Sequence, residues 1–329
     1  MIFLAQIEPV APLPSMKGIH NMELTAGMQI GNFILRERIG LPNMGDVWRA
    51  EPANGPALSV AIKSLHSRHA ADHALRTRFE TECEVHQSLL HPSIVPVIES
   101  VLHGRERFLI MSFIDGGSLE DRLREGALPE PAAVDIAIQI LDALDHAHRN
   151  GVLHRDVKPS NILCSGSKAF IADFGISYSL RHQANRIGDT SGTIAYMSPE
   201  QIQSVSTADQ RSDVYGFGCV LYEMLTGRPP FPLDEAAPCS PDELKLMHIR
   251  QLPIPPRRFR PNLDPRLEAI ILRALAKDPA ARFPGCGSFA VALRSLADAP
   301  ALPEVGTGLI FAWLAASVAA LGLLTLVLD

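Results

Sequence analysis

The sequence predicts an α+β protein in which strands come first and helices follow, with a single membrane-spanning helix at the C-terminus. Three observations indicate this order. Short apolar segments of strand length, separated by turn residues, lie between residues 33 and 65. Longer segments with helical periodicity dominate from residue 129 onward. An uncharged stretch of bilayer-spanning length covers residues 308–328.

Composition is that of a globular chain with room for a core. Apolar residues make up 47% of the 329 residues, and the net charge of −6 gives no indication of a nucleic-acid partner. The five cysteines are dispersed and lack the paired spacing of metal ligands. Such a set indicates reduced thiols in a cytosolic domain.

The N-terminal third is predicted to consist mainly of strands. Residues 1–24 carry several prolines and no periodic pattern, so we expect an extension without regular structure. Strands are predicted over 33–39, 46–50, 58–65 and 107–111, and a helix over 71–90.

The remainder is predicted to be mainly helical. Apolar side chains share one face over 129–150, and Asn150-Gly151 ends that helix. Two short strands, 161–163 and 169–171, follow it. The segment 212–227 is apolar nearly all round, so we expect a buried helix. Further helices are expected from about residues 242, 266 and 288.

The segment His154–Asn161 carries the most specific chemical signal. A carboxylate, Asp156, is followed by Lys158 and the amide Asn161, and a second carboxylate, Asp173, follows a short apolar strand. Phosphoryl transfer from ATP needs a group that orients the attacking hydroxyl, a cation on the moving phosphate, and oxygen ligands for the metal. We expect Asp156 to orient the hydroxyl and accept its proton, and Lys158 to neutralise the γ-phosphate. Asn161 and Asp173 would bind the metal.

This segment, together with Asp173-Phe174-Gly175, resembles the eukaryotic-type protein kinases. The resemblance implies a two-lobed protein kinase fold over 25–298, with a mainly β N-lobe (about 31–111) and a mainly α C-lobe (about 115–298). It implies ATP as substrate, with Mg²⁺ or alternatively Mn²⁺. Lys158 is typical of serine/threonine kinases, and the segment Gly192–Gln201 resembles the bacterial membrane-associated branch.

The resemblance also implies a nucleotide site shared by the two lobes. Its expected residues are Ile39, Gly40, Gly45, Val47, Ala61, Lys63, Glu82, Met111, Ser112, Ile114 and Leu163. Lys63 would contact the α- and β-phosphates, and among the acidic residues of the following helix the family spacing favours Glu82 as its partner. Backbone groups of Ser112 and Ile114 would pair with the adenine.

The glycine-rich turn before Val47 departs from the family pattern, because Pro42 stands where the second glycine is usual. Proline removes an N–H group and fixes φ. This puts nucleotide affinity and the mobility of the turn in question.

The segment from Asp173 to Glu200 resembles an activation segment. The resemblance implies that Glu200 pairs with Arg282, and that Arg155 awaits a phosphate on Thr190 or Ser191, the regulatory sites. Two further residues have expected structural roles. Thr193 would hydrogen-bond near Asp156, and Asp213 would accept hydrogen bonds from the catalytic loop, cap its own helix, or do both.

The uncharged C-terminal stretch is about 21 residues long, or roughly 31 Å as a helix, which matches a bilayer core. After a linker at 299–307, we expect residues 308–328 to contact membrane lipid in a single pass, with the kinase domain in the cytoplasm. The alternative is a buried terminal helix. Ala312, Ala316 and Ala320 could support a homodimer, but alanine is equally common as filler, so both interpretations remain open.

Three other functions fit parts of the pattern: a membrane-tethered pseudokinase or scaffold, a small-molecule phosphotransferase, and an ATP-binding sensor. Pro42 favours the first, whereas Lys63, Asp156, Asn161 and Asp173 oppose it. Small-molecule phosphotransferases lack a segment like the one that ends here at Glu200, and they lack the arginine, here Arg282, that pairs with it. The sequence does not identify the protein substrates.

Overall fold

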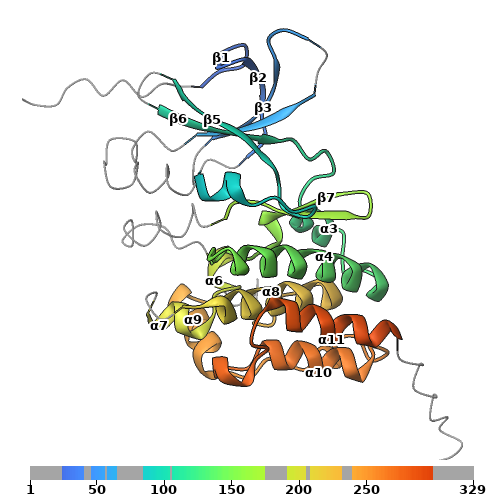
Figure 1. The fold of residues 1–329 in the computed structure, drawn as a ribbon. Helices are drawn as coiled ribbons and strands as arrows, with labels where there is room; N and C mark the ends of the chain where they lie inside the picture. Colours follow the sequence, from blue (N-terminus) through green and yellow to red (C-terminus); the bar gives the residue numbers. More distant parts are fainter. Residues whose placement is uncertain are drawn as a thin grey trace, which may run out of the picture.

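The structure is a computed structural model and describes residues 24–40, 46–55, 58–64, 84–103, 106–174, 191–204, 208–231 and 239–298. It has the two lobes that the resemblance implied, a β-rich N-lobe above a helical C-lobe (Figure 1). Part of the predicted helix 71–90 is described, and residues 84–88 there are helical. The segments 1–23 and 299–329 lie outside the described residues.

The N-lobe is a six-stranded antiparallel sheet with the order β1-β2-β3-β4-β6-β5. The strands are β1 Gln29–Ile30, β2 Phe33–Arg38, β3 Val47–Pro52, β4 Val60–Ser64, β5 Val97–His103 and β6 Glu106–Ser112. The sequence missed β1 and β5. The edge strand β5 exposes Ile98 and Leu102 and buries none of its residues fully, so it lacks the apolar run that marks a core strand.

Successive residues of the central strands pack on opposite faces of this sheet, as the two-residue period of a strand requires. On β4, Val60 and Ile62 belong to a cluster on the outer face, whereas Ala61 belongs to a cluster that faces the C-lobe. Leu24 is buried in the outer cluster, so ordered structure begins before the boundary we predicted at residue 25.

The C-lobe is built around α8 (Gln210–Thr226), which packs against α4 (Glu130–Arg149), α10 (Pro265–Ala274) and α11 (Cys286–Asp298). Most residues of α8 are buried, which agrees with its nearly all-apolar sequence. The helix begins at the N-cap Asp209 and ends at Gly227, which has φ 75°. Asp213 therefore lies inside the helix, and the capping alternative for it is wrong.

Shorter elements surround this core. They are α3 Leu119–Arg124, η1 Pro159–Asn161, the hairpin β7 Ile162–Ser165 and β8 Lys168–Ile171, α6 Ser191–Ile194, α7 Pro199–Gln203, α9 Pro241–Arg250, η3 Pro256–Arg258 and η4 Pro279–Ala281. The hairpin lies on α4 at the junction of the lobes (Figure 1). Across the described ranges, no helix combines the length and apolar character needed to cross a bilayer. The segment predicted to do so, 308–328, is not among them.

Candidate active site

The residues expected around the adenine gather in one apolar cluster between the lobes. Ala61 and Met111 come from the sheet and are buried. Val47, Ile114 and Leu163 pack against them from β3, the segment after β6, and β7. Ile39 is 45% exposed and is not part of the cluster. Apolar side chains gathered at this junction suit contact with a flat aromatic base.

Gly40 allows the backbone of the turn before β3 to lie close to the Val47 side chain. A Cβ at this position would lie 2.9 Å from Cβ of Val47, closer than such atoms approach in real structures. The N–H groups of Ile39 and Gly40 both donate to the Val47 carbonyl, at 2.8 and 3.3 Å. The rest of the glycine-rich turn, with Pro42 and Gly45, lies outside the described residues.

The segment that joins the lobes docks on β7. The Ser165 hydroxyl donates to Asp115 at 2.8 Å, and the Cys164 N–H donates to the Gly117 carbonyl at 2.9 Å. A Cβ on Gly116 would lie 1.9 Å from the Cys164 carbonyl oxygen, so only glycine fits there. The N–H of Ser112 already donates to Pro96 at 2.9 Å. The expected pairing of Ser112 with adenine would therefore use its carbonyl oxygen.

Lys63 on β4 meets Asp173, which follows β8, with Nζ 2.7 Å from Oδ1. The lysine side chain is 5% exposed, so the pair is largely shielded from water. Burial disfavours the charge on Asp173, but the Lys63 ammonium and its hydrogen bond, together with His86 and His154, lower the pKa of that carboxyl. Asp173 has φ 63°, an uncommon value for a residue with a side chain. Glu82, the expected partner of Lys63, lies outside the described residues.

The catalytic loop brings Asp156, Lys158 and Asn161 together. Lys158 Nζ lies 2.9 Å from Asp156 Oδ2, and it also donates to the Thr193 hydroxyl at 3.3 Å. Asn161 Nδ2 donates to the backbone carbonyl of Asp156 at 2.8 Å and to its carboxylate at 3.1 Å. The Ala172 N–H donates to the Asn161 carbonyl at 2.9 Å, which joins this loop to the segment with Asp173.

Asp213 braces the catalytic loop from inside α8. Its carboxylate accepts the backbone N–H of Arg155 at 2.7 Å and that of His154 at 2.9 Å. Arg155 has φ 64°, so the loop is bent at the residue before Asp156. Burial opposes the charge of Asp213, but its hydrogen-bonded contact with His148 (2.7 Å) and the backbone donors lower its pKa.

Sequence reasoning assigned no role to two histidines of this site, because their contacts join them to residues distant in the sequence. His148 lies on α4, and its ring contacts the Asp213 carboxylate. His154 hydrogen-bonds through Nε2 with the Ala172 carbonyl at 2.8 Å and accepts the Asp156 N–H at Nδ1, 3.2 Å away. Its ring packs on Phe174 at 4.8 Å, and His86 packs on Phe174 at 5.4 Å.

Glu200 and Arg282 form a bidentate pair, with N–O distances of 2.7 and 2.8 Å. The arginine side chain is fully buried and also donates to the carbonyls of Ala276, Arg211 and Lys277. Burial opposes the charge on Glu200, but Arg282 and the Ser212 hydroxyl lower its pKa. The pair ties the end of the activation segment to the C-lobe core, where the sequence placed it.

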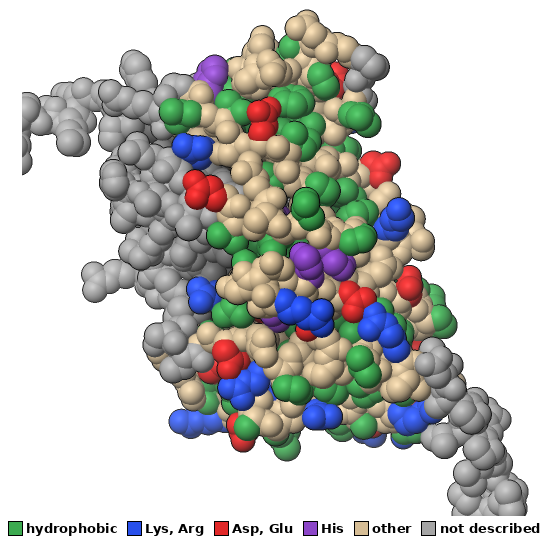
Figure 2. Space-filling model, in the orientation of Figure 1, with side chains coloured by type: hydrophobic (Ala, Val, Ile, Leu, Met, Phe, Trp, Pro, Cys, Tyr) green, Lys and Arg blue, Asp and Glu red, His purple; other side chains and the backbone are tan. Residues whose placement is uncertain are grey.

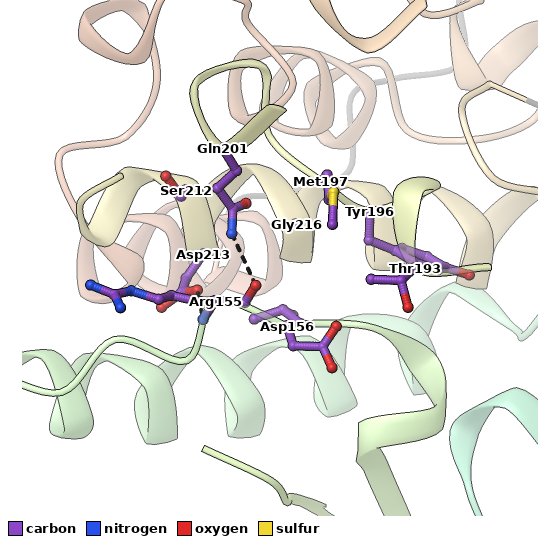
Figure 3. A pocket seen from close by; sticks show the side chains of 10 residues that line it. Arg155, Asp156, Thr193, Tyr196, Met197, Gln201, Ser212, Asp213 and Gly216 are labelled. Atoms are coloured by element: carbon purple, nitrogen blue, oxygen red, sulfur yellow. Dashed lines mark hydrogen bonds between the residues drawn. The ribbon is translucent and has the colours of Figure 1, made fainter. Parts of the chain in front are cut away.

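A small pocket opens beside Asp156 (Figure 3), bounded by the catalytic loop, the start of α8 and the segment from Thr193 to Gln201. Gln201 Nε2 donates to the Arg155 carbonyl at 2.9 Å and fixes one wall. Ser191 begins α6, but its side chain is not described, and Thr190 lies outside the described residues. Arg155 and Thr193 thus lie at the catalytic loop, whereas the hydroxyls of Thr190 and Ser191, which the resemblance implied as regulatory sites, are not placed.

A model of the protein kinase domain family matches residues 33–289. The serine/threonine-protein kinase PknB of Mycolicibacterium smegmatis is 39% identical over 233 residues, which are 68% of this chain and 36% of PknB. PknE of Mycobacterium tuberculosis is 38% identical over 275 residues, which are 82% of this chain and 47% of PknE. The chain thus spans less than half the length of these relatives.

Solved structures with a similar fold also point to the protein kinases. The crystal structure of the Mycobacterium tuberculosis PknI kinase domain matches with a TM-score of 0.64 and 28% identity, covering 83% of this chain and 99% of that one. Rad53 1–466 in complex with AMP-PNP matches with a TM-score of 0.63 and 28% identity, covering 79% and 64%. This chain therefore belongs to the protein kinase family, as a eukaryotic-type serine/threonine kinase of the group found in bacteria.

Proposed function

We propose that this protein transfers the γ-phosphate of ATP to serine or threonine hydroxyls of proteins. The observation that carries the proposal is the meeting of Lys158 and Asn161 on the Asp156 carboxylate, at 2.9 and 3.1 Å. A carboxylate in this arrangement can orient a hydroxyl and accept its proton, while the adjacent ammonium stabilises charge that develops on the phosphoryl group.

The residues beside this loop fit a divalent metal ion. Asn161 uses Nδ2 toward Asp156 and Asp173 uses Oδ1 toward Lys63, which leaves the amide oxygen and Oδ2 as ligand atoms. Such oxygen ligands suit Mg²⁺, with Mn²⁺ as the alternative. When bound, the metal would neutralise phosphate charge and fix the phosphate geometry.

The chain's own residues have separable tasks in this scheme. The cluster around Ala61 and Met111 would hold the adenine and exclude water from it. Lys63 would move between its ion pair with Asp173 and the nucleotide phosphates. Thr193 positions Lys158 through their hydrogen bond, and Asp213 fixes the loop backbone on which Asp156 stands.

The competing function is a pseudokinase or scaffold without phosphoryl transfer. Its one supporting feature, Pro42, lies outside the described residues, and Lys63, Asp156, Asn161 and Asp173 are all present. The test is incubation of the full chain with γ-labelled ATP and a general protein substrate, with and without a metal chelator. Metal-dependent label on serine or threonine supports the kinase. Tight ATP binding without transfer at any metal concentration establishes the scaffold.

We also propose autophosphorylation of Thr190 or Ser191. The support is Arg155, a cation held beside Asp156 by Asp213 and Gln201, toward which a phosphorylated segment could dock. The labelled protein would be digested and its phosphate mapped. Label on either residue, and loss of activation in the Thr190→Ala/Ser191→Ala variant, is expected. Label only elsewhere would exclude this form of regulation.

Finally, we propose that residues 308–328 anchor the chain in a membrane, with the kinase domain in the cytoplasm where ATP is available. The support is the uncharged sequence of that segment. The full chain should resist alkaline extraction from vesicles, whereas a chain ending at Asp298 should be released. Equal release of both would exclude the anchor. Cross-linking in the bilayer would decide whether the alanines at four-residue spacing bring two chains together.

A further inference from the structure

The base of the C-lobe carries an exposed surface that phosphoryl transfer does not use. The segment 250–262 contains four arginines and no aspartate or glutamate. We call its exposed part the basal surface, which consists of Arg250, Leu252, Ile254, Arg257, Arg258 and Phe259. It combines positive charge with apolar side chains, which together suit a lipid headgroup region.

The apolar side chains of the basal surface are unusually accessible. Leu252 is 76%, Ile254 42% and Phe259 37% exposed. The backbone beneath them is fixed, because the Tyr222 hydroxyl donates to the Ile254 carbonyl at 2.8 Å and Arg260 donates to the Leu128 carbonyl at 2.7 Å. The surface is therefore presented by a rigid segment.

Its positive charge has little local compensation. Among the described residues, no carboxylate forms an ion pair with the side chain of Arg250, Arg257 or Arg258. Glu268 contacts the backbone of this surface and accepts the N–H of Arg257 at 2.7 Å. Arg228 adds a further cation, since its guanidinium lies 4.6 Å from the centre of the Phe259 ring.

The basal surface and the predicted anchor adjoin two helices that pack against each other. The basal surface leads into α10, which packs against α11, and both helices form the end of the C-lobe opposite the N-lobe sheet (Figure 1). Several Lys and Arg side chains lie along the lower edge of the molecule in Figure 2, among hydrophobic and a few acidic ones. The linker 299–307, fully extended, would place the predicted span within roughly 30 Å of the end of α11.

We propose that the basal surface rests on the anionic headgroups of the bilayer that residues 308–328 span, an inference that depends on the anchor in the proposed function. The arginines would contact lipid phosphates, and Leu252, Ile254 and Phe259 would enter the headgroup boundary. An acidic protein could recognise the same charges, but the short linker favours the lipid, because it confines the surface near the bilayer.

The test uses the full chain in nanodiscs of phosphatidylcholine, with or without phosphatidylglycerol, and hydrogen–deuterium exchange of residues 250–262. Anionic lipid should slow exchange there, and Arg257→Glu/Arg258→Glu should abolish the effect, since each arginine near a charged bilayer contributes about fivefold in binding. The control, Arg36→Glu/Lys168→Glu, makes the same change in net charge on exposed side chains elsewhere and should retain the protection.

Each outcome is decisive. Protection that requires anionic lipid and both basal arginines supports the proposal. Equal exchange in both nanodiscs overturns it, while insertion of the chain leaves the anchor and the kinase activity standing. Failure of the chain to enter either nanodisc overturns the anchor and the basal contact together. Protection by a polyglutamate peptide but not by anionic lipid would assign the surface to an acidic protein partner instead.

Discussion

Lys63 Nζ and Asp173 Oδ1 lie 2.7 Å apart and connect the N-lobe sheet to the segment that follows the C-lobe hairpin. A substituted lysine leaves the aspartate in a buried site without its cation, and a substituted aspartate does the reverse. Each residue thus supplies the opposite charge for the other, and each is expected to contact part of the Mg²⁺–ATP complex. The pair therefore acts as one unit at the boundary of the two lobes.

We expect Lys63→Met and Asp173→Asn each to lower kcat/KM for phosphoryl transfer by at least about a hundredfold, because each removes charge stabilisation from the transferring phosphate. Because the two residues act together, the double variant should be little worse than either single variant. Steady-state kinetics of the parent, the two single variants and the double variant form a double-mutant cycle that measures this coupling. Fully multiplicative losses would contradict the coupling of the two residues.

Gly116→Ala should disturb the connection between the lobes. The added Cβ would lie 1.9 Å from the Cys164 carbonyl oxygen, so the backbone must shift, at a cost of about 1–3 kcal/mol. We expect a lower melting temperature and weaker nucleotide binding, measured by thermal unfolding with and without ATP. Gly192→Ala is the control, since a Cβ there meets nothing within 4 Å. Equal melting temperatures for the two variants would show that the segment joining the lobes tolerates the backbone shift.

Arg282→Met should destabilise the C-lobe strongly. It leaves Glu200 without its bidentate partner in a site where the arginine is fully buried, and breaking such a pair costs about 3–5 kcal/mol. Chemical denaturation measures the loss. Arg294→Met is the matched control, because Arg294 pairs with Asp142 at the exposed surface, where a pair contributes about 1 kcal/mol or less. A similar loss in both variants would refute the special role of the buried pair.

Acid should destabilise the fold partly through His86. Burial lowers the pKa of His86 from 6.5 to about 4, so the unfolded chain takes up a proton at a higher pH than the folded one. The stability present above pH 6.5 is therefore lost as the pH falls toward 4, by on the order of 3 kcal/mol. His86→Leu should flatten the unfolding free energy across this window. An unchanged pH dependence would mean that His86 titrates alike in both states.

Motif spacing predicted the parts of the site that a short segment encodes. Asp156, Lys158 and Asn161 lie within six residues, so their convergence could be anticipated. Glu200 and Arg282 lie 82 positions apart, and only the resemblance to the protein kinases implied their pairing. The contacts of His148 with Asp213 and of His154 with Phe174 join residues far apart in the chain. They depend on how helices and loops pack in three dimensions, which periodicity does not specify. The apolar sequence of α8 predicted that this helix is buried. The role of Asp213 stayed undecided because its contacts lie in another part of the chain.

Nucleotide binding and phosphoryl transfer by Asp156→Asn test the central claim most directly. The full chain and this variant would be compared for their Kd for Mg²⁺–ATP and their rate of transfer to a peptide hydroxyl. Asparagine can keep the bond from Asn161 but cannot accept a proton. We predict a Kd within about twofold of the parent and a rate at least about a hundredfold lower. A rate within about tenfold of the parent would contradict the assignment of Asp156 as the catalytic base.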